Sequence, residues 1–304
     1  MQKDLLKLLD LSTEDITNIL NTADQLKYNQ KHGIPHEHLK GKTLAMVFEK
    51  NSTRTRVSFE TGMYQLGGHA LFLSGKESQI GRGEPIEDTA RVLSRYCDGI
   101  MIRTFSQEGL EKLAKHATVP VINAGDGGHN HPTQTLTDLL TIHREKGEFK
   151  GLTIGCCGDL KFGRTVHSLI SAMSRYRNIK VVLISPEELK LPKYIKYEVL
   201  EKNGMEYVET TSLEEAIPQL DVLYMTRIQR ERFDDPAAYE RLKNSYILDP
   251  AKMALAKEKM CVLHPLPRVN EISIAVDSDP RAAYFRQALN GKFVRMALIL
   301  KLLE

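Results

Sequence analysis

The run Ser52-Thr53-Arg54-Thr55-Arg56 contains the residue types of an anion site, and it lies between an apolar segment and an apolar helical face. At a helix start, free backbone N–H groups, hydroxyl donors and a guanidinium fork together suit a phosphate, and the helix dipole favours negative charge there. The run therefore predicts a phosphate-binding helix start. In a plainer interpretation, Ser52 or Thr53 only caps the helix and the arginines are solvated. The sequence contains no nucleotide P-loop motif and no G-x-G-x-x-G motif.

Further polar positions follow later apolar segments of the first half, at Arg103, at the glycine-rich segment 123–128, and at His131 with Gln134. His131 precedes Pro132, which biases it toward an extended conformation just before the next helix, where Gln134 lies in the first turn. Both side chains could then face one ligand. A lone histidine is as often a structural hydrogen-bonding residue, so this alternative stays open.

The second half repeats the pattern in the segments 158–164, 226–229 and 264–268. Arg164 ends a glycine-spaced turn after an apolar segment, and Arg227 ends another apolar segment. Each arginine alone could be a surface charge, but their shared placement favours a ligand site. In His264-Pro265-Leu266-Pro267, the prolines fix a non-helical path, so that backbone carbonyls can face the N–H groups of a ligand. The prolines alone would indicate a plain loop.

The elements that must position these residues alternate along the chain. Strands are expected at 43–48, 70–73, 99–103, 119–123, 152–157, 180–185, 222–225 and 261–264. Helices are expected between them, and a closing helix at about 281–303. This alternation predicts an α/β protein with parallel sheets covered by helices. The polar stretch 147–151 separates two such series, and the polar clusters fall at the carboxyl ends of strands, where open α/β sheets bind ligands.

Composition limits the remaining classes of function. The chain has 304 residues, 41% hydrophobic and 27% charged, which is typical of about two ordinary globular domains. Its net charge of +3 is too small for a general nucleic-acid or membrane surface. Charged residues interrupt the leucines near the start, so we expect no signal peptide, and no stretch is long enough to span a bilayer. Four scattered cysteines lack the spacing of a zinc site or disulfide framework, and we expect buried free thiols in a reducing cytoplasm.

The motifs, taken together and in this order, resemble those of the aspartate/ornithine carbamoyltransferase family over nearly the whole chain. They are Ser-Thr-Arg-Thr-Arg, His-Pro-Thr-Gln, Gly-Asp-Leu-Lys-Phe-Gly-Arg-Thr-Val-His and His-Pro-Leu-Pro-Arg. The resemblance implies two parallel-sheet α/β domains with the active site in the cleft between them and the C-terminal helix returning to the first domain. We expect a carbamoyl-phosphate-binding domain at 1–134 with about 288–304, and an aspartate-binding domain at 135–287. The resemblance also implies homotrimers with shared active sites; it leaves the presence of regulatory chains open.

The resemblance assigns a role to each matching residue. Carbamoyl phosphate would be bound by Ser52, Thr53, Arg54, Thr55, Arg103, His131 and Gln134, and by the backbone at Leu266 and Pro267, which would receive its amino group. Among these, Arg54 would hold the phosphate, and Arg103, Thr55 and His131 would polarise the carbonyl. A neutral amine attacks that carbonyl, so the site needs positioning and charge stabilisation but no protein nucleophile, cofactor or metal.

The second half indicates which amine attacks. Aspartate presents two carboxylates, and Arg164, Arg227 and Gln229 resemble the aspartate branch of the family. By contrast, the segments 48–51 and 78–85 resemble the ornithine branch. In the second of these, Arg82 takes the place nearest to a lysine that the aspartate branch offers to a neighbouring subunit.

The resemblance thus implies carbamoyl transfer to L-aspartate, giving N-carbamoyl-L-aspartate and phosphate, in pyrimidine synthesis in the cytoplasm. Two alternatives remain at this point. One is ornithine as the acceptor. The other is a catalytically silent family member that binds carbamoyl phosphate or acts as a partner subunit.

Overall fold

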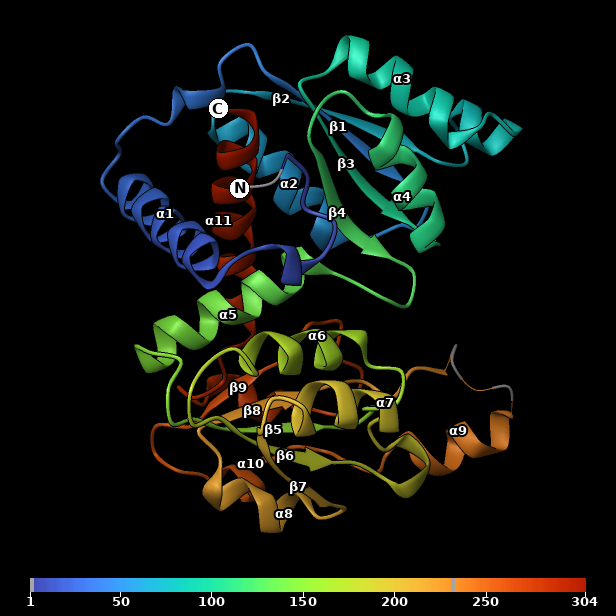
Figure 1. Cartoon of the computed structure of the whole chain (residues 1–304). Helices are drawn as coiled ribbons and strands as arrows, with labels where there is room; N and C mark the ends of the chain where they lie inside the picture. The colour runs from blue at the N-terminus through green and yellow to red at the C-terminus, as the bar shows by residue number, and fades with distance from the viewer. Residues whose placement is uncertain (1–2, 231–232, 234) are drawn as a thin grey trace. The chain divides into compact units, whose positions relative to one another are not determined.

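The computed structural model describes residues 3–230, 233 and 235–304. The chain divides into two compact units (Figure 1): unit 1 is Met1–Leu140 with Ala288–Glu304, and unit 2 is Thr141–Gln287. Both divisions fall inside helices, α5 (Pro132–Lys146) and α11 (Tyr284–Leu303). The chain therefore leaves unit 1 through α5 and returns to it in α11.

Unit 1 contains a four-stranded parallel sheet in the order β2-β1-β3-β4. Its strands are β1 (Thr43–Phe48), β2 (His69–Ser74), β3 (Gly99–Thr104) and β4 (Val121–Asp126). In β1, the last five residues are all buried, as expected of a strand covered on both faces. Met46 pairs with Phe72 on one side and with Met101 on the other, which fixes the register.

Helices cover both faces of this sheet. Ala45 and Val47 of β1 share a buried cluster with α3 (Ile86–Tyr96) and α4 (Gln107–His116). On the opposite face lie α2 (Thr53–Gln65) and α11 (Figure 1), and a Cβ added at Gly62 of α2 would lie 3.1 Å from Met296 of α11. Helix α1 (Thr13–Lys31) begins at a capping box of Ser12 and Asp15, and Asp15 also binds Lys301 of α11 at 3.1 Å.

Unit 2 contains a five-stranded parallel sheet in the order β7-β6-β5-β8-β9. Its strands are β5 (Thr153–Cys157), β6 (Lys180–Ile184), β7 (Glu206–Thr210), β8 (Val222–Met225) and β9 (Cys261–Leu263). The sequence analysis missed β7. Three of its five residues are exposed, because it is an edge strand, and its glutamates hide the apolar signal of a buried strand.

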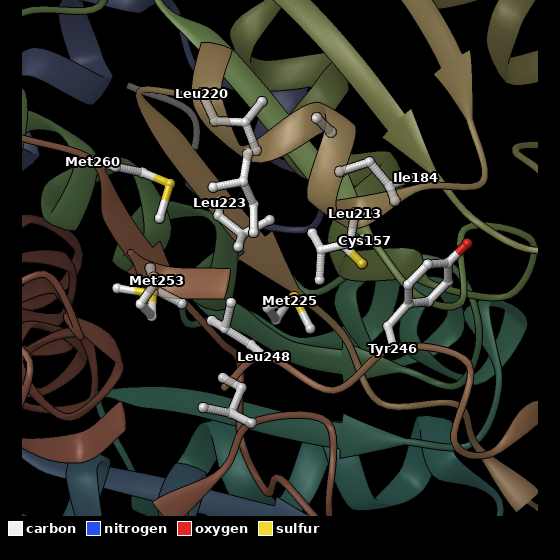
Figure 2. Packing of buried hydrophobic residues seen from close by; sticks show 14 of the residues in the cluster. Cys157, Ile184, Leu213, Leu220, Leu223, Met225, Tyr246, Leu248, Met253 and Met260 are labelled. Atoms are coloured by element: carbon white, nitrogen blue, oxygen red, sulfur yellow. The ribbon is translucent and has the colours of Figure 1, made fainter. Parts of the chain in front are cut away.

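One buried cluster of unit 2 lies on the face of this sheet beside α8 (Leu213–Ala216) and α10 (Pro250–Met253). Figure 2 shows Cys157, Leu223 and Met225 of the strands gathered with Leu213 and Leu248. The other face carries α6 (Arg164–Met173) and α7 (Lys193–Ile195), and α9 (Pro236–Leu242) follows β8 along the chain (Figure 1).

The cysteines behave as the sequence predicts. Cys97, Cys156, Cys157 and Cys261 are all free and buried. Burial raises the pKa of Cys156 and of Cys261 to about 12, so both thiols stay protonated and unreactive in the folded chain.

Short 3-10 helices complete the fold: η1 (Leu8–Asp10), η2 (Glu37–Leu39), η3 (Gln79–Arg82), η4 (Glu187–Leu189), η6 (Ile217–Gln219) and η8 (Ile274–Ser278). The segment η5 (Lys196–Glu201) is π-helical. Among the described residues, no helix is both long and apolar enough to cross a membrane.

Candidate active site

Each sheet has a point at which its strand order reverses. In unit 1, the chain proceeds outward from β1 to β2 and then from β3 to β4 in the other direction, so the reversal lies between β1 and β3. In unit 2, it lies between β5 and β8 for the same reason. Ligands of open α/β sheets bind beyond the carboxyl ends of the strands at these points. Ser52 to Thr55 follow β1, Arg103 lies near the end of β3, and Arg164 and Arg227 follow β5 and β8. Other predicted residues follow neighbouring strands: His131 and Gln134 follow β4, and Leu266 and Pro267 follow β9.

Glu49 holds the reversal point of unit 1 together. Its N–H donates to the Arg103 carbonyl at 2.9 Å, and its Oε2 accepts from the Phe105 N–H at 3.2 Å and from the Thr104 hydroxyl. The ends of β1 and β3 are therefore fixed relative to one another. This contact aligns the start of α2 with Arg103.

The start of α2 carries the cap that the plainer interpretation of the run 52–56 predicts. Ser52 is the N-cap: its Oγ accepts from the Thr55 N–H at 3.4 Å and donates to Thr55 Oγ1 at 3.0 Å. Capping therefore does occur, but it leaves Thr53 and Arg54 exposed at the helix start. Desolvation lowers the pKa of Arg54, although the residue as a whole remains exposed. Arg56 points elsewhere, since it pairs with Glu60 at 3.3 Å.

Arg103 and His131 are brought together in the interior of unit 1, with 9% and 7% of their surface exposed. Arg103 Nη1 donates to the Ala124 carbonyl at 2.8 Å and lies 3.3 Å from His131 Nε2. A guanidinium can only donate, so Nε2 is the acceptor in this arrangement, and Nδ1 lies 3.4 Å from the Thr133 hydroxyl. His131 therefore orients Arg103, and it can donate to a ligand from Nε2 only when that nitrogen carries a proton.

Gln134 lies one helical turn before Asp138 on α5, and its Nε2 donates to Asp138 Oδ1 at 2.8 Å. Asp138 is fully buried and acts electrostatically on Arg295 of α11, which is also influenced by Arg54 and Arg103. Burial, with the nearby Arg103, lowers the pKa of Arg295 to about 10. Arg295 thus lies within electrostatic range of two other guanidinium groups and of the Asp138 carboxylate.

In unit 2, hydrogen bonds of Thr226 hold the ends of β5 and β8 together. The Asp159 N–H donates to Thr226 Oγ1 at 3.1 Å, and the same hydroxyl donates to the Cys157 carbonyl at 2.9 Å. Asp159 Oδ1 then accepts from the Phe162 N–H at 2.9 Å, which closes the turn before α6. Arg164, the first residue of α6, and Arg227 both follow directly from this bonded pair of strand ends.

The chain after β9 turns sharply. Leu266 has a φ of 54°, and the Leu266–Pro267 peptide bond is cis. Arg268 forms a bidentate contact with Asp277 and lies over the Tyr284 ring at 5.4 Å. The backbone at Leu266 and Pro267 is therefore held in one non-helical conformation, as the prolines predict.

Two family profiles match this chain, one over each half. The profile "Aspartate/ornithine carbamoyltransferase, carbamoyl-P binding domain" matches residues 3–144, and the profile "Aspartate/ornithine carbamoyltransferase, Asp/Orn binding domain" matches residues 150–302. The chain belongs to the aspartate/ornithine carbamoyltransferase family. The family predicted from the motifs is confirmed, and so are the two parallel-sheet α/β domains.

Relatives in this family match over almost their full length. The aspartate carbamoyltransferase catalytic subunit of Clostridium novyi (strain NT) is 54% identical over 302 residues, covering 99% of this chain and 98% of the relative. The catalytic subunit of M. jannaschii aspartate transcarbamoylase superposes with a TM-score of 0.93 at 44% identity, covering 99% and 98% of the two chains. The Trypanosoma cruzi aspartate transcarbamoylase in complex with N-(phosphonacetyl)-L-aspartic acid has a TM-score of 0.93 at 39% identity, covering 99% and 96%.

The family loop that includes Arg82 lies between β2 and α3. Arg82 is the exposed last residue of η3, and Ser78, just before η3, donates its hydroxyl to the Gly75 carbonyl at 3.2 Å. Within its own chain, Arg82 is thus presented outward. Its action in a neighbouring subunit stays a prediction.

Three residues that organise the site escaped the sequence analysis: Glu49, Asp138 and Arg295. Two of them left a readable signal. Asp138 follows Gln134 by four residues on one helix, the spacing at which such side chains meet. Arg295 is a charged residue within the apolar run of the last helix, where burial without a function is costly.

Proposed function

We propose that this chain transfers the carbamoyl group from carbamoyl phosphate to the amino group of L-aspartate, giving N-carbamoyl-L-aspartate and phosphate. The observation that carries the proposal is the pair of anion-binding sets, one at the reversal point of each sheet. The names of its relatives, which are aspartate carbamoyltransferases, support the same reaction. The product places the reaction in pyrimidine synthesis.

Unit 1 would bind carbamoyl phosphate. The proposed ligands in unit 1 are Ser52, Thr53, Arg54, Thr55, Arg103, His131 and Gln134. The backbone carbonyls of Leu266 and Pro267, which belong to unit 2, would accept from the amino group. Arg54, exposed at the start of α2, neutralises the phosphate together with the helix dipole. Arg103, buried and oriented by His131, donates to the carbonyl oxygen as it becomes negative.

Unit 2 would bind aspartate through Arg164, Arg227 and Gln229. Two carboxylates call for two guanidinium groups, and the bonded ends of β5 and β8 supply one each. The neutral amine nitrogen attacks the carbonyl carbon, the bond from that carbon to the phosphate oxygen breaks, and the departing phosphate takes the amine proton. Positioning and charge stabilisation drive this reaction, so no cofactor or metal takes part in the proposal.

The assembly belongs to the proposal as well. The proposed functional domains are residues 1–134 with about 288–304 for carbamoyl phosphate, and residues 135–287 for aspartate. We expect a homotrimer in which Arg82 reaches the aspartate carboxylate of a neighbouring subunit; the presence of regulatory chains stays open. Buried free thiols fit a cytoplasmic protein.

The test compares L-aspartate and L-ornithine as acceptors for carbamoyl phosphate, with the same purified chain. Turnover with aspartate alone supports the proposal. Turnover with ornithine alone would mean that the ornithine-like segments 48–51 and 78–85 outweigh the arginines of unit 2. Absence of turnover, with carbamoyl phosphate still raising the melting temperature, would indicate a silent binding member of the family.

A further inference from the structure

A buried histidine–glutamate pair lies directly after β9. His264 and Glu271 are 1% and 4% exposed, and His264 Nε2 lies 2.7 Å from Glu271 Oε1. A buried polar pair of this kind is costly unless each of its atoms finds a partner. The partners that the structure gives these two side chains all belong to one loop, residues 264–271.

The backbone fixes which nitrogen of His264 carries the proton. The Leu266 N–H donates to His264 Nδ1 at 2.8 Å, so Nδ1 must be an unprotonated acceptor. Nε2 therefore carries the hydrogen and donates it to the Glu271 carboxylate. If the proton moved to Nδ1, it would face the Leu266 N–H as a second donor, and the bond to Leu266 would be lost.

Glu271 fixes the other end of the same loop. Its Oε2 accepts from the Val269 N–H at 3.0 Å and from the Asn270 N–H at 3.1 Å, and its backbone carbonyl accepts from Leu248 at 2.9 Å. Leu266, between these anchors, has a φ of 54°, a conformation that a leucine keeps only when its surroundings enforce it. The His264–Glu271 pair supplies that enforcement from both sides of Leu266 and Pro267.

We infer that His264 and Glu271 are positioning residues that hold the Leu266 and Pro267 carbonyls as acceptors for the carbamoyl amino group, and thereby select carbamoyl phosphate over acyl phosphates without N–H donors. The inference rests on the proposed function, since it takes those carbonyls as the amino-group ligands. A carbonyl oxygen held in place forms a hydrogen bond with an N–H donor, but it loses its partner when a methyl group takes the donor's place. A fixed orientation of the two carbonyls therefore favours the ligand that carries N–H groups.

The test measures the dissociation constants of carbamoyl phosphate and of acetyl phosphate by titration calorimetry. Acetyl phosphate has a methyl group where carbamoyl phosphate has its amino group. In Glu271→Gln, the amide cannot accept at both ends, because its NH2 group meets either the His264 Nε2–H or the Val269 and Asn270 N–H groups. We expect wild type to prefer carbamoyl phosphate by at least about 10-fold, and the variant to lose about 10-fold of that preference with acetyl phosphate binding unchanged.

A matched control is available in the same unit. The Asp221 carboxylate also accepts from a backbone N–H, that of Thr153 at 2.9 Å, and from a side chain, Lys257 at 2.8 Å. It lies at the amino ends of the strands, away from the loop. Asp221→Asn should leave the preference for carbamoyl phosphate as in wild type.

A second pair of variants decides the case if Glu271→Gln does not fold. In His264→Asn, the side-chain oxygen takes the place of Nδ1 and can still accept from Leu266; in His264→Gln, the longer side chain reaches toward Glu271 instead. We expect His264→Asn to keep more of the selectivity than His264→Gln.

The outcomes separate the two levels of the argument. A wild type that binds both phosphates equally would show that Leu266 and Pro267 do not receive the amino group, and the proposed roles of these carbonyls would fail. A selective wild type with an equally selective, folded Glu271→Gln would overturn the inference alone. If Glu271→Gln bound carbamoyl phosphate and acetyl phosphate more weakly by the same factor, the inference would also fail, because that result indicates that the His264–Glu271 pair is merely structural.

Discussion

A methyl group added at Gly158 should displace the residues proposed to bind aspartate and leave the residues of unit 1 proposed to bind carbamoyl phosphate in place. Its φ is 115°, and a Cβ there would lie 2.7 Å from Thr226 Oγ1 and closer still to the Thr226 carbonyl oxygen. Ordinary contact begins near 3.4 Å, and the nearer atom belongs to the backbone, which cannot rotate away. In Gly158→Ala, the ends of β5 and β8 must therefore move apart by about 1 Å.

The magnitude follows from comparison with Gly204, whose φ is 63° and whose added Cβ would meet nothing within 4 Å. Gly204→Ala should cost only the left-handed strain, about 1–2 kcal/mol of unfolding free energy. Gly158→Ala adds overpacking of about 1–3 kcal/mol to at least the same strain. We expect it to lose about 3 kcal/mol or more in urea unfolding.

The same displacement should change the kinetics. Arg227 directly follows Thr226, and a misplacement of about 1 Å can lower a rate by about 10²-fold. We therefore expect kcat/KM for aspartate to fall by about 10²-fold in Gly158→Ala, with little change in the dissociation constant of carbamoyl phosphate. Steady-state phosphate-release kinetics measure kcat/KM for aspartate, and titration calorimetry measures the dissociation constant of carbamoyl phosphate. If Gly158→Ala is no less stable than Gly204→Ala and keeps its aspartate kinetics, the argument from the bonded strand ends is wrong.

Three further predictions concern single charges. Arg54→Ala should lower kcat by a factor of about 10²–10³ with little loss of thermal stability, because the exposed guanidinium acts on the transition state; near-normal turnover would remove that role. Arg227→Ala should chiefly raise KM for aspartate, by about 10-fold or more, and an unchanged aspartate curve would exclude Arg227 from the site. The Arg268 guanidinium holds the pKa of the Asp277 carboxyl below its usual range, so the carboxylate stabilises the fold above the unfolded pKa of about 3.9 and loses this effect as pH falls through the lower folded pKa. Asp277→Asn should thus cost about 1 kcal/mol at neutral pH and progressively less as the pH falls below about 4, as urea unfolding at a series of pH values would show; a cost independent of pH would contradict the charge argument.

Alternation of apolar segments was sufficient to predict the strands that are buried on both faces. The bounds of β8 were predicted without error, and those of β1 likewise, because such strands read as continuous apolar runs. The edge strand β7 gave no such signal. The strand β4 also ran further than expected, to Asp126 rather than residue 123, because Asp126 pairs with Thr104 of β3 beyond an irregularity in the register. At this irregularity, the Asn123 side chain accepts from the Gly125 N–H at 2.7 Å.

The candidate site divided in the same way between residues with a local signal and residues without one. Ser52 could be recognised as a cap from its place before a helix, and the structure shows that cap at the start of α2. Anion binding at the same helix start stays a prediction. Glu49 had no local signal in the sequence, since its partners Thr104 and Phe105 lie at the end of the neighbouring strand β3, more than fifty residues away in sequence. Only the pairing of β1 with β3 makes Glu49 a residue of the site.

The buried charges of unit 1 favour the binding of an anion. Arg103 and Arg295 are both buried and lie within electrostatic range of one another, and the Asp138 carboxylate offsets the charge of Arg295. Burying like charges side by side costs stability, and desolvation already lowers the pKa of Arg295. A phosphate bound at the nearby Arg54 would add the negative charge that this arrangement favours. The fold therefore carries an electrostatic cost that such a phosphate would relieve. Under the proposed function, the binding energy released in this way would become available for orienting the carbamoyl group.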